Sequence, residues 1–144
     1  MKGNETMKLK VMLDPGAKMP TRAHAMDAGL DLYSRDTEYI GGDCSKIFDT
    51  GVHIEIPEGY VGMVKSKSGL NINKGLQCEG VIDAGYTGSI VVKLYNRGNT
   101  VKIKRGQKIA QLVILPIITP ELEQVDALAD TERGDNGFGS SGAF

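Results

Sequence analysis

One segment of the sequence, residues 80–88 (GVIDAGYTG), carries a carboxylate that could act on a bound water molecule. Asp83 follows a short apolar strand and enters an Ala-Gly turn, and Tyr86 leaves that turn before the next strand begins. An Asp of ordinary pKa, about 3.9, is ionised at neutral pH and can serve as a general base. Because Asp also caps turns without any catalytic role, the residues alone leave both roles open. Asp31, in residues 27–34 (DAGLDLYS), carries the same two alternatives.

Two further segments hold groups that suit phosphate oxygens. In residues 65–70 (KSKSGL), Lys67 and Ser68 stand just before a short helical pattern, and a helix N-terminus with such donors can bind an anion. Residues 106–112 (GQKIAQL) add a lysine and two glutamines at the start of another apolar strand. Each of these signals is weak by itself.

Residues 133–144 (RGDNGFGSSGAF) form a glycine-rich tail that cannot propagate a strand or bury a core. This composition is typical of a frayed chain end, and it also suits a mobile lid over a nucleotide. Arg133 can bind phosphate oxygens in a fork, backbone N–H groups can hold an anion, and Phe138 can stack on a base.

The elements that must position these residues are short β-strands. Apolar and polar residues alternate, or β-branched residues gather, at residues 9–13, 52–56, 60–64, 89–95, 101–104 and 108–115. Glycines recur between these runs, at positions where a turn or bulge can require a positive φ. This pattern predicts an all-β fold, a jelly-roll-like barrel or sandwich. Two short helices are predicted as well, over residues 68–73 and over residues 120–128, which begin with a proline.

Composition narrows the class of protein. The chain has 144 residues, of which 40% are hydrophobic and 24% charged, and its formal net charge is −1. These values predict one folded domain, residues 1–132, followed by a mobile tail, residues 133–144. The charge balance excludes binding to nucleic acid through a polybasic surface.

Cysteines, histidines and apolar runs point to a cytoplasmic protein. Cys44 and Cys78 match no metal-binding spacing, and neither His24 nor His53 lies near them in the sequence. We therefore expect two buried free thiols, as in a reducing compartment. Residues 1–10 lack the apolar core of a secretory signal, and no apolar run approaches the roughly 20 residues of a membrane span.

In chain order, five segments resemble the five motifs of the trimeric dUTP diphosphatases (dUTPases). The segments are residues 27–34, 65–70, 80–88, 106–116 (GQKIAQLVILP) and 133–142 (RGDNGFGSSG). The resemblance covers about residues 20–142, and its third and fifth motifs are the most specific. It implies hydrolysis of dUTP to dUMP and pyrophosphate by attack of water at the α-phosphate, which keeps uracil out of DNA and supplies dUMP.

The resemblance also implies roles for individual residues. Asp83 matches the residue that activates the water, and Gln111 matches one that helps to hold it. Asp31 matches a carboxylate that acts through a water on Mg²⁺, an ion held chiefly by the phosphates without a direct protein ligand. The residues that match substrate-binding positions are Lys67, Ser68 and Gly69 for the phosphates, Gln77, Val81, Ile82 and Tyr86 for the nucleoside, and Arg133, Phe138, Gly139 and Ser140 in the tail.

The family implies a homotrimer in which the tail of one subunit closes over the site of a neighbour. One departure concerns the second motif, where the family usually has Arg and this chain has Lys67, which keeps the charge but loses the planar fork.

Two alternative functions remain. The related dCTP deaminases need a Glu where this chain has Lys93, which disfavours deamination. A non-catalytic, dUTPase-like regulatory protein is the other, although no long insertion interrupts the motifs.

Overall fold

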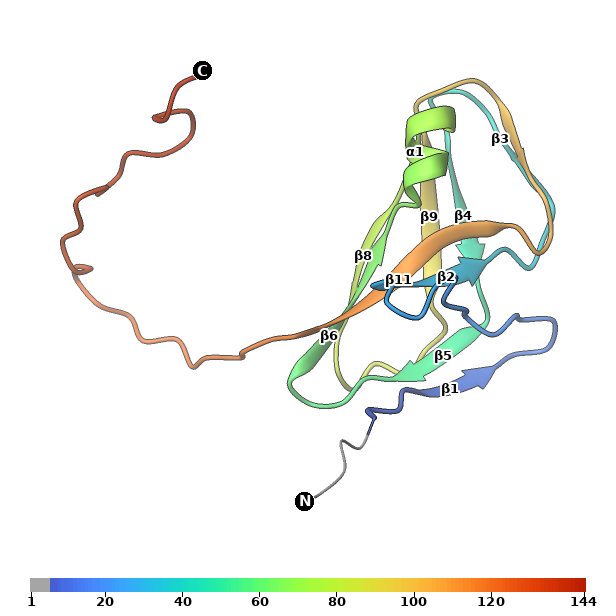
Figure 1. Cartoon of the computed structure of the whole chain (residues 1–144), viewed down its shortest axis with the longest axis horizontal. Helices are drawn as coiled ribbons and strands as arrows, with labels where there is room; N and C mark the ends of the chain where they lie inside the picture. Colours follow the sequence, from blue (N-terminus) through green and yellow to red (C-terminus); the bar gives the residue numbers. More distant parts are fainter. Residues whose placement is uncertain (1–5) are drawn as a thin grey trace.

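The computed structural model describes residues 6–144, and its regular elements are antiparallel strands apart from one short helix (Figure 1). The elements are β1 (Lys10–Leu13), β2 (Gly29–Tyr33), β3 (Glu38–Ile40), β4 (Ser45–Asp49), β5 (Val52–Glu55), β6 (Tyr60–Lys65), α1 (Ser68–Lys74), β7 (Leu76–Gln77), β8 (Glu79–Ile82), β9 (Val91–Asn96), β10 (Val101–Ile103) and β11 (Lys108–Pro116). The all-β, jelly-roll-like prediction is confirmed.

Four small sheets make up the body. The largest has the order β2-β11-β6-β8, and a second has the order β4-β9-β7. Two further pairs, β1-β5 and β3-β10, complete the body. Because β11 lies between β2 and β6, it brings segments far apart in the sequence side by side.

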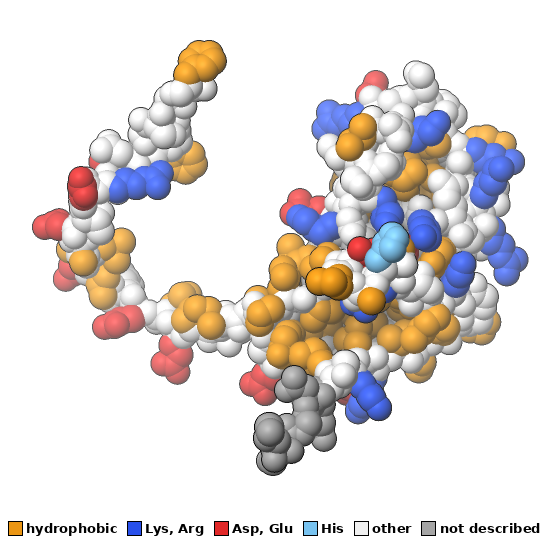
Figure 2. All heavy atoms as spheres, viewed as in Figure 1, with side chains coloured by type: hydrophobic (Ala, Val, Ile, Leu, Met, Phe, Trp, Pro, Cys, Tyr) orange, Lys and Arg blue, Asp and Glu red, His pale blue; other side chains and the backbone are white. Residues whose placement is uncertain are grey.

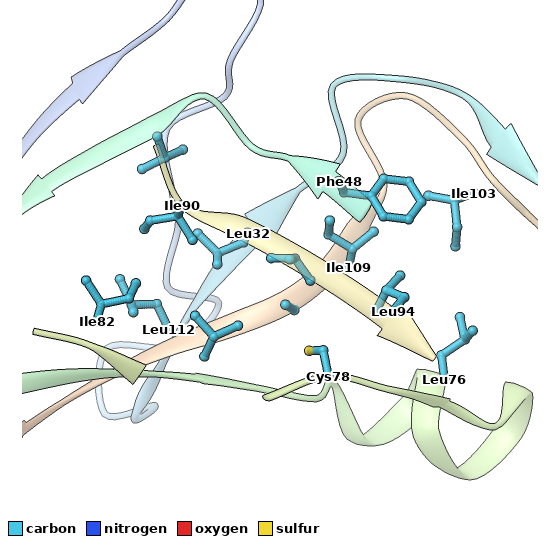
Figure 3. Packing of buried hydrophobic residues seen from close by; sticks show 14 of the residues in the cluster. Leu32, Phe48, Leu76, Cys78, Ile82, Ile90, Leu94, Ile103, Ile109 and Leu112 are labelled. Atoms are coloured by element: carbon cyan, nitrogen blue, oxygen red, sulfur yellow. The ribbon is translucent and has the colours of Figure 1, made fainter. Parts of the chain in front are cut away.

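The core lies between these sheets, as Figure 3 shows. Strand β9 illustrates the period of two, since Val92, Leu94 and Asn96 are buried and the residues between them are exposed. The side chains that meet in the core and are labelled in Figure 3 are Leu32, Phe48, Leu76, Cys78, Ile82, Ile90, Leu94, Ile103, Ile109 and Leu112.

The strands differ from the sequence prediction chiefly in the region of β2, β3 and β4. None of these three was predicted as a strand, because each has three to five residues and little unbroken alternation. The predicted helix at residues 68–73 is confirmed as α1, which ends at Gly75 with a left-handed φ of 69°.

The second predicted helix, over residues 120–128, is wrong. After β11 ends, residues 117–144 contain no helix or strand and extend away from the body (Figure 1). Leu122 is 96% exposed and Leu128 is 86% exposed, so within residues 6–144 these apolar side chains are left without packing, on which short helices depend. The boundary after residue 132 and the mobility of the tail stay predictions.

Both cysteines are free, and Cys78 is buried, where burial raises the pKa of its thiol. Cys44 is exposed, which corrects the expectation of two buried thiols, because it lies in a surface turn rather than on a core-facing strand position. No helix within residues 6–144 combines the length and apolarity that crossing a bilayer requires. The expectation that residues 1–10 carry no secretory signal concerns a segment whose first half, residues 1–5, lies outside the described residues.

Candidate functional site

Gln111 occupies the middle of the largest sheet. On β11 it pairs with Asp31 of β2 on one side and with Lys65 of β6 on the other. Its Nε2 donates to the carbonyl oxygen of Ser66 at 2.9 Å. Gly29 leaves room for it, because a Cβ at position 29 would lie 2.1 Å from the Gln111 Oε1. The two neighbouring strands therefore fix the orientation of this amide.

Asp31 is a buried carboxylate at the centre of an ionic group with two partly exposed lysines, which we call the Asp31 cluster. The residue is only 2% exposed, and its two carboxylate oxygens contact Lys67 Nζ at 2.5 Å and Lys108 Nζ at 3.1 Å. Burial acts to raise the pKa of Asp31, but the hydrogen bonds and charges of the two lysines outweigh it and hold that pKa below its ordinary value. Two ammonium groups are thus oriented by one carboxylate.

The start of α1 adjoins this cluster. Lys67 is the N-cap residue, and within residues 6–144 no side chain caps the first turn. A Cβ added at Gly69 would meet nothing within 4 Å, so open space lies beside the backbone there. Together with Ser68, this turn offers uncapped N–H groups and a hydroxyl next to two lysines, an arrangement suited to phosphate oxygens.

Asp83 lies at the end of β8 in a tight turn, residues 83–86, which we call the Asp83 turn. The Tyr86 N–H donates to the Asp83 carbonyl oxygen at 3.1 Å, and Gly85 supplies the positive φ, 93°, that the turn requires. The Tyr86 hydroxyl donates to the Ser89 carbonyl oxygen at 2.9 Å. A Cβ at Gly88 would lie 2.5 Å from that hydroxyl, so Gly88 makes room for the ring.

A cavity of about 230 Å³ opens beside the Asp83 turn. Val81, Ile82, Asp83 and Tyr86 are among the residues that line it. The cavity therefore places the exposed Asp83 carboxylate beside Val81, Ile82 and Tyr86, three residues that the resemblance assigned to nucleoside binding.

A second and larger cavity, of about 940 Å³, lies beside Gln111 and is lined in part by Ser66 and Gln77. It shares no lining residue with the first cavity. Along β6, the partner of Gln111 is Lys65, whereas Ile82, which precedes Asp83, pairs with Gly62. Three residues of extended strand span about 10 Å, so one chain keeps Asp83 and Gln111 apart.

The tail residues form a third, separate group. Arg133 donates through Nε to the Asn136 carbonyl oxygen at 2.7 Å, and Phe138 is fully exposed. Figure 2 shows the tail standing apart from the body, with hydrophobic side chains along it. Within residues 6–144, the structure thus brings together Asp31, Lys67 and Gln111, separately Asp83 and Tyr86, and leaves Arg133, Phe138, Gly139 and Ser140 away from both.

Sequence reasoning missed two residues of the site. Lys108 binds Asp31 from β11, and Ser66 anchors the amide of Gln111 through its carbonyl oxygen. Both lie inside the segments that were singled out, but a pairing between β2 and β11 is a long-range fact that their spacing does not reveal. Among the described residues, 6–144, no three His, Cys, Asp or Glu side chains gather as a metal-binding group.

Comparison with known proteins gives a consistent family. The dUTPase family model matches residues 16–142. A deoxyuridine 5'-triphosphate nucleotidohydrolase of Clostridium tetani is 40% identical over 141 residues, which cover 95% of the chain and 97% of that protein. Its counterpart from Mycolicibacterium gilvum is 44% identical over 142 residues, covering 92% of each.

Solved structures of phage dUTPases also resemble this chain. The dUTPase of Staphylococcus bacteriophage 80alpha, determined with dUPNHPP, is 36% identical and superposes with a TM-score of 0.92 over 96% of this chain and 100% of its own. A dUTPase mutant from phage phi11 of S. aureus, described with a structural Mg(II) ion, is 35% identical with a TM-score of 0.80 over 84% and 98%. The resemblance read from the five segments is confirmed, and the chain belongs to the dUTPase family.

Proposed function

We propose that this chain hydrolyses dUTP to dUMP and pyrophosphate. The family supports this reaction, because the solved relative from phage 80alpha is a dUTPase determined with dUPNHPP. The observation that carries the proposal is the cavity beside the Asp83 turn, where an exposed carboxylate and Tyr86 line the same space. In this cavity the nucleoside lies against the Tyr86 ring, and the backbone of β8 reads the uracil edge.

In the proposed mechanism, Asp83 acts as a general base. Its ionised carboxylate accepts a proton from a water molecule whose oxygen attacks the α-phosphorus. The bond between the α-phosphorus and the oxygen bridging to the β-phosphate breaks, and pyrophosphate leaves. Gln111 helps to hold the water, since its side-chain orientation is already fixed by Ser66.

The phosphates are bound by the Asp31 cluster and the first turn of α1. Lys67 and Lys108 neutralise charge on the triphosphate, while Ser68 and the backbone at Gly69 donate hydrogen bonds to it. Asp31 keeps both ammonium groups oriented before the substrate binds.

The site also fits a magnesium ion that arrives with the triphosphate. Both oxygens of Asp31, the buried carboxylate of the site, are already bound by lysines, and this favours an ion held by phosphates and water over one held directly by protein. When bound, Mg²⁺ neutralises charge on the phosphate oxygens and the leaving pyrophosphate.

We propose further that the chain is a homotrimer whose active sites combine residues from different subunits. The separation of Asp83 from Gln111 and the distance of the tail from both support this arrangement. In the trimer, Asp83 of one subunit faces Gln111 of a neighbour, and the tail of a subunit closes the site, with Arg133 on the phosphates and Phe138 on the uracil ring.

We propose the cytoplasm as the compartment, since both cysteines are free thiols.

Mixing two inactive chains tests the shared site. One chain ends at Glu132 and lacks the tail; the other is full length and carries Asp83→Asn. After joint refolding, mixed trimers combine an intact Asp83 with an intact tail, so we expect activity that neither chain shows alone. Activity that stays at the sum of the two separate chains at every ratio would contradict sharing.

Deamination of dCTP is not favoured. Lys93 on β9 carries an ammonium 5.1 Å from the centre of the Tyr95 ring, on the exposed side of the strand. A lysine held there cannot shuttle protons at a cytosine amine as a carboxylate would. A regulatory role would come in addition to hydrolysis, as in the phage 80alpha dUTPase, which belongs to phage dUTPases that control transfer of virulence genes.

The decisive experiment measures pyrophosphate release by the purified full chain with Mg²⁺, using dUTP, dTTP, dCTP and UTP at equal concentrations. We expect strong preference for dUTP, because we propose that the cavity beside the Asp83 turn is too narrow for the 5-methyl group of thymine and that the Tyr86 ring leaves no space for a 2'-hydroxyl. Release of ammonia from dCTP would favour deamination instead. Failure to release pyrophosphate from any of the four nucleotides would contradict the proposed function.

A further inference from the structure

The Asp83 turn is held at its exit by the corner between β4 and β5. Ser89 donates through Oγ to the Asp49 carboxylate, and the Ile90 N–H donates to the Val52 carbonyl oxygen at 2.8 Å. These contacts fix the chain as it leaves the turn. They lie outside the groups that contact substrate in the proposed mechanism.

One contact at this corner comes from an ionisable side chain, His53 of β5. Its Nδ1 lies 2.7 Å from the carbonyl oxygen of Thr87, the residue that follows Tyr86. Its Nε2 lies 3.0 Å from Oδ1 of Asp14, just beyond the end of β1. The side chain is only 18% exposed, so water competes weakly for both nitrogens. His53 therefore bridges the β1-β5 pair to the chain segment that carries Asp83.

The two partners of His53 determine its protonation. A carbonyl oxygen can only accept a hydrogen bond, so Nδ1 must carry a proton. In a neutral ring with that tautomer, the Nε2 lone pair would face a carboxylate oxygen and be repelled. The imidazolium satisfies both partners, since both nitrogens then donate. The geometry is that of a cation held between a carboxylate and a backbone carbonyl.

Hydrogen bonds and nearby carboxylates around His53 raise its pKa, and they outweigh burial, which lowers it. The hydrogen bond to Thr87 is the main cause that raises its pKa, followed by the hydrogen bond to Asp14, and the charge of Asp49 contributes. Asp49 is itself paired with Arg35 at 3.5 Å. On the outer side, the exposed pair of Lys10 and Glu55, 3.2 Å apart, carries no net charge.

We propose that His53, as an imidazolium paired with Asp14, is a positioning residue that orients the Asp83 turn through the Thr87 carbonyl. The inference rests on the proposed function, since the turn must carry the general base. While His53 is protonated, its hydrogen bond to Thr87 is charge-assisted and the turn is held. As the pH rises through the raised pKa, the proton is lost, Nε2 and Asp14 repel each other, and the turn loosens.

The test compares kcat for dUTP in wild type and His53→Asn from about pH 6 to about pH 9. Asn keeps a donor near the Nδ1 position but cannot become a cation. We expect the ratio of wild-type to variant kcat to be about fivefold at the acidic end, as for the loss of one charge-assisted hydrogen bond, and to approach one at the alkaline end. Other ionisations affect both enzymes equally and cancel in the ratio.

Two control variants keep the outcome decisive. His24→Asn changes the other histidine of the chain, which pairs with Asp27 in an exposed loop, and should leave kcat unchanged at every pH. Asp14→Asn removes the charge paired with His53, so the His53 imidazole, followed by NMR, should titrate at a lower pH. The fall in kcat with rising pH should then occur at the same lower pH. If His53→Asn does not fold, Asp14→Asn alone still tests the inference.

A ratio that is independent of pH, whether one or larger, would overturn the inference, because a merely structural role has no reason to vanish as His53 deprotonates. So would an Asp14→Asn variant whose His53 titration and kcat profile match wild type. An inactive wild type instead contradicts the proposed function, so the two failures are distinguishable.

Discussion

The two aspartates singled out by the sequence occupy opposite environments. Asp31 is 2% exposed and held by two lysines, whereas Asp83 lies on an exposed turn, and none of the ion pairs within residues 6–144 involves it. A carboxylate with both oxygens bound to ammonium groups orients cations but cannot readily accept a proton. A carboxylate facing a cavity can act on water. The same residue type thus serves two purposes, and its surroundings decide which.

The largest effect is expected from Asp83→Asn. Removing the proposed general base should lower kcat for dUTP by about a thousandfold, because positioned bases contribute roughly this much to a hydrolysis. Stability should change by no more than about 0.5 kcal/mol, since the side chain is exposed. Steady-state kinetics and chemical denaturation of the same preparation provide both values. A variant that keeps the wild-type rate would remove Asp83 from the chemistry.

Asp31→Asn, unlike Asp83→Asn, should clearly lower the stability of the fold. The amide cannot pair with two ammonium groups in a buried position, so we expect a loss of about 1–3 kcal/mol in the free energy of unfolding. Because the folded-state pKa of Asp31 is lowered, its contribution is complete above the ordinary pKa, about 4, and is lost as the pH falls through the lowered value.

Urea denaturation of wild type and Asp31→Asn across this acidic range checks the prediction. The difference between the two chains should be constant near neutral pH and shrink on acidification. Asp83→Asn is the matched control, since it removes an exposed carboxylate from the same fold. A difference between Asp31→Asn and wild type that persists unchanged to low pH would show that the ionic contacts of Asp31 are not what stabilises the region.

The comparison also explains what the sequence could predict. Alternation along strands such as β9 gave the all-β class, and the five segments gave the family, because both signals are local. The partners of Asp31 were not predictable, since they depend on β11 lying beside β2. The residues of one strand do not reveal which other strand it pairs with. The predicted helix over residues 120–128 is wrong for a related reason, because its apolar residues find no packing partner within residues 6–144.

The smallest effect is expected at Lys67, where the resemblance to the dUTPase motifs leads us to expect Arg in most relatives. Arg in this position would keep the charge and add a planar fork, so Lys67→Arg should lower KM for dUTP by no more than about threefold and leave kcat unchanged. Lys67→Gln, the matched uncharged variant, should raise KM because Asp31 and the phosphates lose one of their two lysines.

Steady-state kinetics at fixed Mg²⁺ distinguish charge from geometry at Lys67. If Lys67→Arg matched wild type while Lys67→Gln weakened binding, charge alone would matter, and Lys108 would supply the second contact that a guanidinium fork supplies in relatives with Arg. If Lys67→Arg instead lowered kcat, the longer side chain would be disturbing the Asp31 cluster. That cluster leaves little room for change, since the carboxylate at its centre is buried and contacts two cations, whereas the exposed Asp83 turn is free to meet the substrate.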